Sequence, residues 1–162
     1  MTVSTSSSNS IDLDDYDRKI LRALQGSADY SMADLGSLIG LSHTPCWRRL
    51  KRLEAEGIIR GKVTLLDPLK VGLHVVVHSA VRLTGHQTEA LDEFEAGLQD
   101  IPEVLECYAS TGDSDYLLKV VVNSIEHYQR LLNERLRALP HVASIRSNFA
   151  LKQVKYTTEL PL

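Results

Sequence analysis

The sequence is poor in cysteine and has no long hydrophobic run. Its two cysteines, Cys46 and Cys107, lie far apart, and neither has a second Cys or His at the spacing of a zinc site. A disulfide scaffold is therefore excluded, and we expect reduced thiols and no structural metal. No apolar segment approaches the roughly 18 residues that a membrane-spanning helix needs. The N-terminal residues lack the basic start and apolar centre of a signal peptide, so we expect a cytoplasmic protein with no membrane partner.

Motifs of catalytic chemistry are also missing. The sequence contains no glycine-rich phosphate loop, no Gly-x-Ser-x-Gly nucleophile turn and no His-Glu-x-x-His pair. His74 and His78 point to the same face of a predicted strand, but at about 3.3 Å per residue they lie roughly 13 Å apart, too far to share a metal ion. We therefore expect no catalytic residue, no metal site and no cofactor.

The charge is balanced over the chain but not locally. The 162 residues carry a net charge of −3, with 43% apolar and 24% charged residues, which is ordinary for a folded protein. Residues 43–62 hold six Lys or Arg against two Asp or Glu, whereas residues 67–162 hold nine against thirteen. The positive potential is concentrated in one short segment, which can face phosphate groups.

Three short helices are predicted around this basic segment. Residues 1–10 are a Ser/Thr/Asn tail with too little apolar surface to offset the entropy of ordering, and we expect them to be disordered. Apolar residues then recur at helical spacing over 14–25, a second helix starts after Ser31 and ends at Gly40, and a third is capped by Ser42. A tight turn before a basic third helix predicts a helix-turn-helix.

The third helix has one apolar side and one basic side. At about 100° per residue, Cys46, Leu50 and Leu53 face inward, and Arg49 lies close enough to this stripe that a carboxylate partner is its expected role. Residues 58–66 are β-branched and apolar around charged positions, which predicts a short strand, or wing. The residues expected to contact DNA are Ser42, His43, Thr44, Trp47, Arg48, Lys51, Arg52 and Lys62. The alternative is a three-helix interaction module whose basic face is solvated.

The second half of the chain contains an internal repeat offset by 38 residues. Leu98-x-x-Ile101-Pro102-x-Val104 matches Leu136-x-x-Leu139-Pro140-x-Val142. Each copy reads strand, helix, strand, which predicts a βαββαβ ferredoxin-like fold with both helices on one face of a four-stranded antiparallel sheet. The expected elements are strands at 74–83, 103–111, 115–123 and 142–151, and helices at 88–100 and 125–139.

The chain is therefore predicted to be an α+β protein of two domains. A winged helix-turn-helix over 11–62 is followed by a hinge at 63–73, which contains Asp67-Pro68, and by a ferredoxin-like domain over 74–162. The strand at 116–122 is apolar at nearly every position, although a strand with one wet face should alternate. We expect a second subunit to cover that face.

The loop between the two repeats places polar groups beside a glycine. Residues 111–116 read Thr-Gly-Asp-Ser-Asp-Tyr, with two carboxylates, a phenol and a glycine that permits unusual dihedral angles. The carboxylates would suit the ammonium group of an amino acid, and nearby backbone amides could bind its carboxylate. The alternative is an ordinary hairpin turn, for which Gly-Asp-Ser-Asp is common sequence.

Three separated segments resemble one protein family. They are Leu41–Ile59, the Gly112–Tyr116 loop and the closing segment Val154–Leu162. In this order they resemble the Lrp/AsnC family, the leucine-responsive and asparagine-responsive bacterial regulators, over residues 11–162. The resemblance implies a winged helix-turn-helix, a regulatory domain, homodimers that assemble into octamers or related species, and an amino-acid effector bound between dimers near the loop. The implied effector site comprises Tyr108, Ser110, Gly112, Asp113, Ser114, Asp115 and Tyr116.

Within the family, Thr44–Arg49, Gly61–Pro68 and Ser147–Ala150 look most like the cysteine-responsive regulators that activate cysteine desulfidase genes. L-cysteine is therefore the first candidate effector, and leucine, methionine, alanine, proline and lysine stay open. The implied function is a sequence-specific regulator of amino-acid metabolism genes that binds double-stranded DNA at a palindromic operator. Two rival interpretations are an effector-independent nucleoid-architectural protein and, ranked last, a small ferredoxin-like enzyme that uses Asp113 or Asp115.

Overall fold

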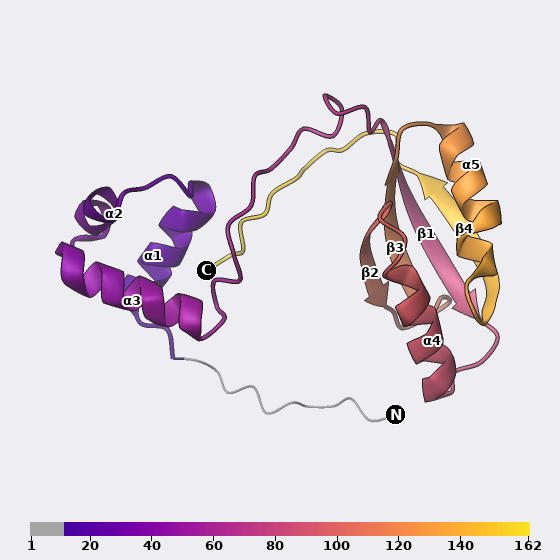
Figure 1. Ribbon diagram of the computed structural model, residues 1–162, viewed down its shortest axis with the longest axis horizontal. Helices are drawn as coiled ribbons and strands as arrows, with labels where there is room; N and C mark the ends of the chain where they lie inside the picture. The colour runs from indigo at the N-terminus through magenta and orange to yellow at the C-terminus, as the bar shows by residue number, and fades with distance from the viewer. Residues whose placement is uncertain (1–11) are drawn as a thin grey trace. The chain divides into compact units, whose positions relative to one another are not determined.

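The computed structural model describes residues 12–162, which divide into two compact units (Figure 1). The helical unit combines the described N-terminal residues with Lys155–Leu162, and the sheet unit is Leu65–Val154. The sequence predicts one C-terminal domain over residues 74–162, whereas the last eight residues belong by their contacts to the helical unit. The disorder expected for residues 1–10 lies outside the described residues. Within 12–162, every helix is too short or too polar to span a bilayer.

The first helix, α1, spans Asp15–Gly26 and begins with a capping box. The Asp14 carboxylate accepts a hydrogen bond from the Asp17 amide at 2.9 Å, and the Asp17 carboxylate accepts one from the Asp14 amide at 3.2 Å. Two amides that have no partner within the helix are satisfied in this way, and the acidic first turn complements the helix dipole. Ile20 and Leu21 face the core.

The turn between α2, Met32–Ile39, and α3, His43–Ala55, depends on two glycines. Gly40 ends α2 in the left-handed region, at φ 77°, where a residue with a Cβ is strained. Gly36 lies against the turn, because a Cβ built on it would be 2.7 Å from the Leu41 carbonyl oxygen. The turn therefore requires glycine at both positions, at Gly40 because of its left-handed φ and at Gly36 because of the close approach.

Serines precede both α2 and α3, as predicted, but only one of them caps through its side chain. The Ser31 hydroxyl accepts a hydrogen bond from the Asp34 amide at 3.1 Å. Ser42 occupies the N-cap position of α3 without a side-chain capping bond, so the predicted cap is wrong in this respect. The third residue of the helix, Pro45, has no amide hydrogen to donate to the Ser42 hydroxyl.

Side chains of the three helices meet in one small core. Cys46, Leu50 and Leu53 of α3 are buried there, which confirms the inward stripe predicted from their spacing. Ile20 and Leu35 complete the centre of the cluster, and each is fully buried. Burial of one such aliphatic side chain contributes about 1.5–3 kcal/mol, so this core fixes the orientation of α3 on the other two helices.

The C-terminal segment is held against α1 by hydrogen bonds to its backbone. The Gln25 side-chain amide donates to the Leu160 carbonyl oxygen at 3.3 Å and accepts from the Leu160 amide at 2.6 Å. The Arg22 Nε donates to the Leu162 carbonyl oxygen at 2.8 Å. The Leu162 side chain packs against the helical core, so the segment contributes both polar and apolar contacts.

Residues 58–66 form no strand, and the wing strand predicted there is not observed. Ile58 and Ile59 pack against the helical core, and the residues that follow them are exposed. A strand needs a neighbour for its backbone groups, and the described part of the helical unit contains no other strand. The chain then turns through the predicted hinge, where the Leu73 amide donates to the Pro68 carbonyl oxygen at 2.8 Å.

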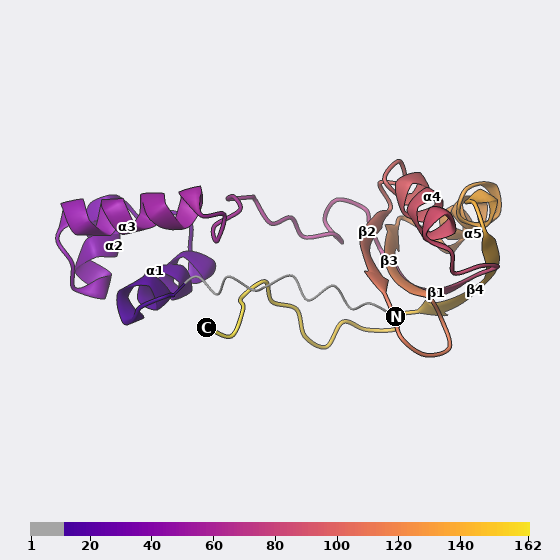
Figure 2. The same cartoon turned by 90° about the horizontal axis from the view of Figure 1, so that it is seen from below.

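Four strands form one antiparallel sheet, and two helices cover one of its faces (Figure 2). The strands are β1 Val75–Leu83, β2 Val104–Ala109, β3 Tyr116–Val122 and β4 Val142–Phe149, in the spatial order β2-β3-β1-β4. The helices are α4 Thr88–Leu98 and α5 Ile125–Glu134, with a 3₁₀ turn at Leu136–Ala138. This is the βαββαβ ferredoxin-like arrangement predicted from the repeat.

The two faces of the sheet differ in what covers them. Under the helices, Leu118 and Val120 of β3 join the core with Phe94 and Tyr128. Strand alternation places Leu117 and Lys119 on the other face, where no helix of the sheet unit lies. Leu117 is 45% exposed there, and this uncovered face of the sheet therefore includes exposed apolar surface.

Candidate nucleic-acid interface and ligand loop

The exposed side of α3 carries the residues predicted to contact DNA. Ser42, His43 and Thr44 are exposed at its N-terminal end, and Trp47 is 48% exposed beside them. The end of α3 that a helix-turn-helix directs at base edges is therefore open. Lys62 is also exposed, in the extended segment after the helix rather than on a wing strand.

The four cations of α3 have different surroundings. The Lys51 ammonium lies 2.7 Å from the Glu54 carboxylate, one turn along the helix. Arg49 and Arg52 both contact a carboxylate of α1. Arg48 is exposed and has no carboxylate partner among residues 12–162. Its guanidinium is therefore the α3 charge most available to an external anion.

A buried carboxylate, Asp17, joins α1 to α3. Its side chain is 1% exposed; the Arg49 Nη1 lies 2.9 Å from one carboxylate oxygen, and the Arg52 Nη2 contacts the other. The Arg49 Nη1 is also 2.6 Å from the Asp14 carboxylate, and its guanidinium lies over the Tyr16 ring. The carboxylate partner predicted for Arg49 is thereby confirmed. Two arginines compensate for the cost of burying one carboxylate.

Hydrogen bonds fix the charges of this cluster. The Asp17 amide and then the Arg49 guanidinium lower the pKa of Asp14 below its ordinary value. The Asp14 carboxylate, with Asp17, raises the pKa of Arg49, and the Asp17 carboxylate raises the pKa of Arg52. Asp14 and both arginines therefore stay ionised around neutral pH.

The role of Asp17 was not predicted from the sequence. The sequence pattern gives Asp17 no role and places Arg52 on the DNA-facing side of the third helix. The structure places Arg52 between the buried carboxylate and the solvent, since its side chain is 41% exposed while one nitrogen contacts Asp17. The available signal was Arg49, whose position near the inward stripe called for a carboxylate from another helix.

The loop between β2 and β3 is a turn closed by backbone hydrogen bonds. The Ser110 amide donates to the Asp115 carbonyl oxygen at 2.8 Å, and Gly112 takes a left-handed φ of 116°. The Asp115 carboxylate accepts from the Leu83 amide at 2.7 Å, and its other oxygen lies 3.5 Å from His86 Nδ1. Asp115 thus connects the loop to the end of β1 through one carboxylate oxygen, and its side chain stays 22% exposed.

The other polar residues of the predicted effector site lie at different depths. Asp113 is exposed and Ser114 is half-buried. Tyr108 is 60% exposed on β2, where its hydroxyl donates to the Glu106 carboxylate at 3.1 Å. The Asp113 carboxylate is therefore accessible to a ligand, and the Tyr108 hydroxyl is already engaged by Glu106 on β2.

Tyr116 points away from the open side of the loop. Its ring is buried 4.7 Å from the Phe94 ring, measured between centroids, and its hydroxyl donates to the Glu95 carboxylate of α4 at 2.6 Å. Burial, and then the bond to Glu95, raise the pKa of Tyr116. In this structure Tyr116 supports the loop from beneath α4, although the sequence analysis grouped it with the ligand-contacting residues.

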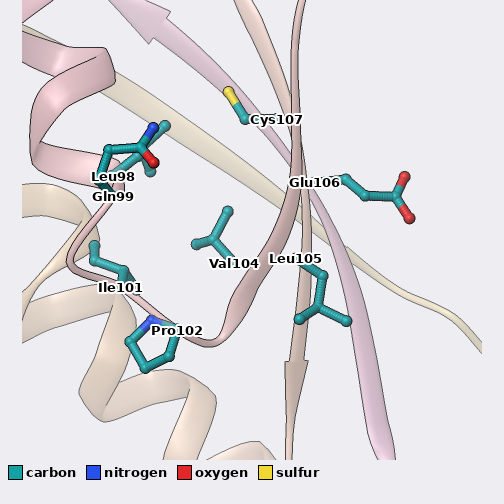
Figure 3. Close-up of a pocket in the computed structure, with 8 residues that line it drawn as sticks. All are labelled: Leu98, Gln99, Ile101, Pro102, Val104, Leu105, Glu106 and Cys107. Atoms are coloured by element: carbon teal, nitrogen blue, oxygen red, sulfur yellow. The ribbon is translucent and has the colours of Figure 1, made fainter. Parts of the chain in front are cut away.

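Two adjoining hollows lie between the end of α4 and the edge strand β2. The first has a volume of about 330 Å³ and is lined by Leu98, Gln99, Ile101, Pro102, Val104, Leu105, Glu106 and Cys107 (Figure 3). The second, of about 200 Å³, shares Cys107 and reaches Glu95 and Tyr116. Desolvation of the thiol, with the nearby Glu95 charge, raises the pKa of Cys107 to about 11. Residues 110–115 of the loop line neither hollow.

A helix-turn-helix with an open basic helix is the mark of a DNA-binding protein, and in this chain a ferredoxin-like domain with an exposed acidic loop follows it. Residues 13–60 match the family model for winged helix-turn-helix DNA-binding, and residues 76–160 match that for the Lrp/AsnC ligand binding domain. The chain belongs to the Lrp/AsnC family of transcriptional regulators, as the resemblance predicted.

Two curated relatives extend this similarity over nearly the whole chain. The glutamate uptake regulatory protein of Zymomonas mobilis is 43% identical over 93% of this chain and 91% of its own length. The DNA-binding transcriptional activator DecR of Escherichia coli K12 is 39% identical over 93% of this chain and 99% of its own length. By name, the first is a regulatory protein and the second a transcriptional activator.

Two solved structures match in both domains. An AsnC family transcriptional regulator from Agrobacterium tumefaciens has a TM-score of 0.87 at 46% identity, covering 91% of this chain and 96% of that one. A transcriptional regulator from Neisseria meningitidis, solved as an L-Met complex, has a TM-score of 0.88 at 36% identity, covering 93% and 97%. The chain is thus a DNA-binding transcriptional regulator with a ligand-binding domain, and not an enzyme.

Proposed function

We propose that the protein is a sequence-specific regulator of amino-acid metabolism genes whose binding to DNA responds to a small amino acid. The observation that carries the proposal is that one chain joins an exposed basic side of α3 to the ligand-binding domain of the family. A DNA target also supports the cytoplasmic location expected from the sequence.

The proposed DNA contacts come from the exposed side of α3 and the segment after it. Arg48, Lys51 and Arg52 supply phosphate or guanine contacts, because guanidinium and ammonium groups suit both. The residues at the N-terminal end of the helix approach the base edges. The full set is Ser42, His43, Thr44, Trp47, Arg48, Lys51, Arg52 and Lys62.

The proposed assembly is a homodimer that pairs through the uncovered face of the sheet and associates further, to an octamer or a similar species. The exposed Leu117 on that face supports this, because a partner would remove apolar surface from water. Two α3 helices related by a two-fold axis read half-sites about 34 Å apart, or a multiple of that distance. The operator is then palindromic.

The proposed effector site is the β2–β3 loop with its flanking residues. Asp113 and Asp115 would bind the ammonium group of an amino acid, and backbone amides beside Gly112 would receive its carboxylate. The set as proposed is Tyr108, Ser110, Gly112, Asp113, Ser114 and Asp115, with the buried Tyr116 supporting the loop from below. L-cysteine is the first candidate on subgroup resemblance alone, and the relatives are named for different amino-acid functions.

A calorimetric titration with the twenty amino acids tests the effector proposal. The ligand that binds wild type should not bind Asp115→Ala, because truncation leaves a buried ligand charge unpaired at a cost of about 2–5 kcal/mol. DNA binding without effector should be retained. Asp92→Ala, which removes an exposed acid from α4, is the matched control and should bind as wild type does.

Each outcome of the titration has a definite meaning. If Asp115→Ala binds and responds to the effector as wild type does, the loop is only a turn and the site lies elsewhere. If no amino acid binds wild type while the protein still coats and compacts long DNA, the effector-independent nucleoid-architectural function replaces the proposed one.

A further inference from the structure

The contacts of Arg52 differ from those of its neighbours on α3. One terminal nitrogen contacts the buried Asp17 carboxylate, yet 41% of the side chain is exposed. A guanidinium has five N–H donors in a fixed plane, so a bond along one edge leaves donors on the other. The Arg49 side chain, in contrast, is only 27% exposed, and its Nη1 contacts the carboxylates of Asp14 and Asp17.

The Asp17 carboxylate is itself fixed from several directions. It accepts from the Asp14 amide in the capping box and from Arg49, and it is fully buried at the start of α1. These bonds hold the Asp17 carboxylate in place, so it cannot move if the Arg52 side chain moves. It therefore restrains the Arg52 guanidinium through Nη2 before any DNA arrives.

We propose that Asp17 is a positioning residue for DNA binding: it grips one edge of the Arg52 guanidinium so that the opposite edge is presented to a backbone phosphate. The inference rests on the proposed placement of α3 against DNA. Its benefit is preorganisation, since a long side chain held in place loses less entropy when it binds. A negative charge close to DNA thereby favours binding through geometry, although its electrostatic effect on the DNA is repulsive.

Charge-conserving substitutions distinguish a guanidinium that contacts both Asp17 and a phosphate from a cation that only attracts the phosphate. Arg52→Lys retains the positive charge, but an ammonium is a point donor that cannot contact Asp17 and a phosphate in the same planar way. On a duplex of scrambled sequence, where only phosphate contacts count, Arg52→Lys should bind about tenfold more weakly than wild type. Arg48→Lys is the matched control on the same helix, and it should lose less than about threefold.

A double-mutant cycle then tests the coupling to Asp17. In the wild-type background Arg52→Gln should weaken binding about tenfold and reduce the slope of log affinity against log salt by about 1. In an Asp17→Asn background the same Arg52→Gln change should cost less than about threefold, because Arg52 has already lost its orientation. Circular dichroism at the binding temperature confirms that each variant is folded.

The possible results distinguish this inference from the proposed function. If Arg48→Gln and Arg52→Gln both leave affinity and salt slope unchanged, α3 does not face DNA and the proposed placement of α3 fails. If Arg52→Gln weakens binding while Arg52→Lys matches wild type, Arg52 binds phosphate without a positioned guanidinium and the inference is overturned. Equal cost of Arg52→Gln in both backgrounds overturns it too. Should Asp17→Asn not fold, the comparison of the two lysine variants decides.

Discussion

Arg48 and Arg49 are adjacent in the sequence but have different surroundings. Arg49→Ala should lower the free energy of unfolding by about 1–3 kcal/mol, because it leaves the buried Asp17 with a single arginine. Arg48→Ala should leave stability unchanged and weaken operator binding by about 1–3 kcal/mol. Urea unfolding and a DNA titration of both variants measure the two effects. Equal stability of the two variants would contradict the role assigned to Asp17.

Cys107 is an exposed residue, but its thiol should be a slow nucleophile. A pKa of about 11 in place of 9.0 lowers the thiolate fraction at pH 8 about a hundredfold, and the greater nucleophilicity of the more basic thiolate recovers about tenfold. Alkylation by iodoacetamide at pH 8 should therefore be about tenfold slower than in the urea-unfolded chain, and it should accelerate as the pH rises toward 11. Cys107→Ser assigns the signal, and equal rates in folded and unfolded protein would show that the thiol is not desolvated.

At the level of single residues, sequence patterns predict burial better than they predict bonding. The helical spacing of Cys46, Leu50 and Leu53 was enough to place them in the core, because burial depends on periodicity. The contact of Arg52 with Asp17 depends on how two helices lie against each other. Likewise, the orientation of Tyr116 beneath α4 follows from strand alternation combined with a helix from the preceding part of the chain.

The α2–α3 turn should be sensitive to any side chain at Gly40. Gly40→Ala places a Cβ in the left-handed region and should destabilise the helical unit by about 1 kcal/mol. Gly26→Ala is the matched control: that glycine ends α1 at an ordinary φ with open space around it, so alanine should be neutral or slightly stabilising. Thermal unfolding compares them. Equal melting temperatures would show that the turn tolerates the strain.

At the level of elements, the internal repeat carried the most information. Two copies of strand, helix, strand give few ways to form one antiparallel sheet, and the observed order follows the predicted βαββαβ pattern. The strand predicted for the wing, in contrast, is not observed. The residues after Gly57 have strand-like composition, but strand formation depends on a hydrogen-bonding neighbour, which composition alone does not reveal.

The proposed assembly predicts that only one of two similar substitutions disrupts the dimer. Leu117→Asp places a charge on the uncovered face of the sheet and should convert the dimer into a monomer, because the pairing would bury an unpaired carboxylate. Ile125→Asp, at an exposed apolar residue in the first turn of α5, should leave the assembly unchanged. Light scattering at micromolar concentration measures both. A dimer that survives Leu117→Asp would place the interface elsewhere.

At the level of the molecule, the sequence located two domains but not the return of the chain to the first. Residues 155–162 come soon after the last strand, which ends at Phe149, and local composition gives no reason to assign them to the first domain. Their contacts with Gln25 and Arg22 are made to backbone atoms, which any sequence would offer. Such a long-range contact is visible only in three dimensions.

This return has a consequence for the order in which the protein is made. A ribosome synthesises the chain from its N-terminus, so the three helices emerge first. The contacts of Leu160 and Leu162 can form only after the whole sheet unit has been synthesised. A nascent chain therefore carries an incomplete helical unit until residues 155–162 have been synthesised. The part that binds DNA reaches its final packing only when the part that binds the ligand already exists.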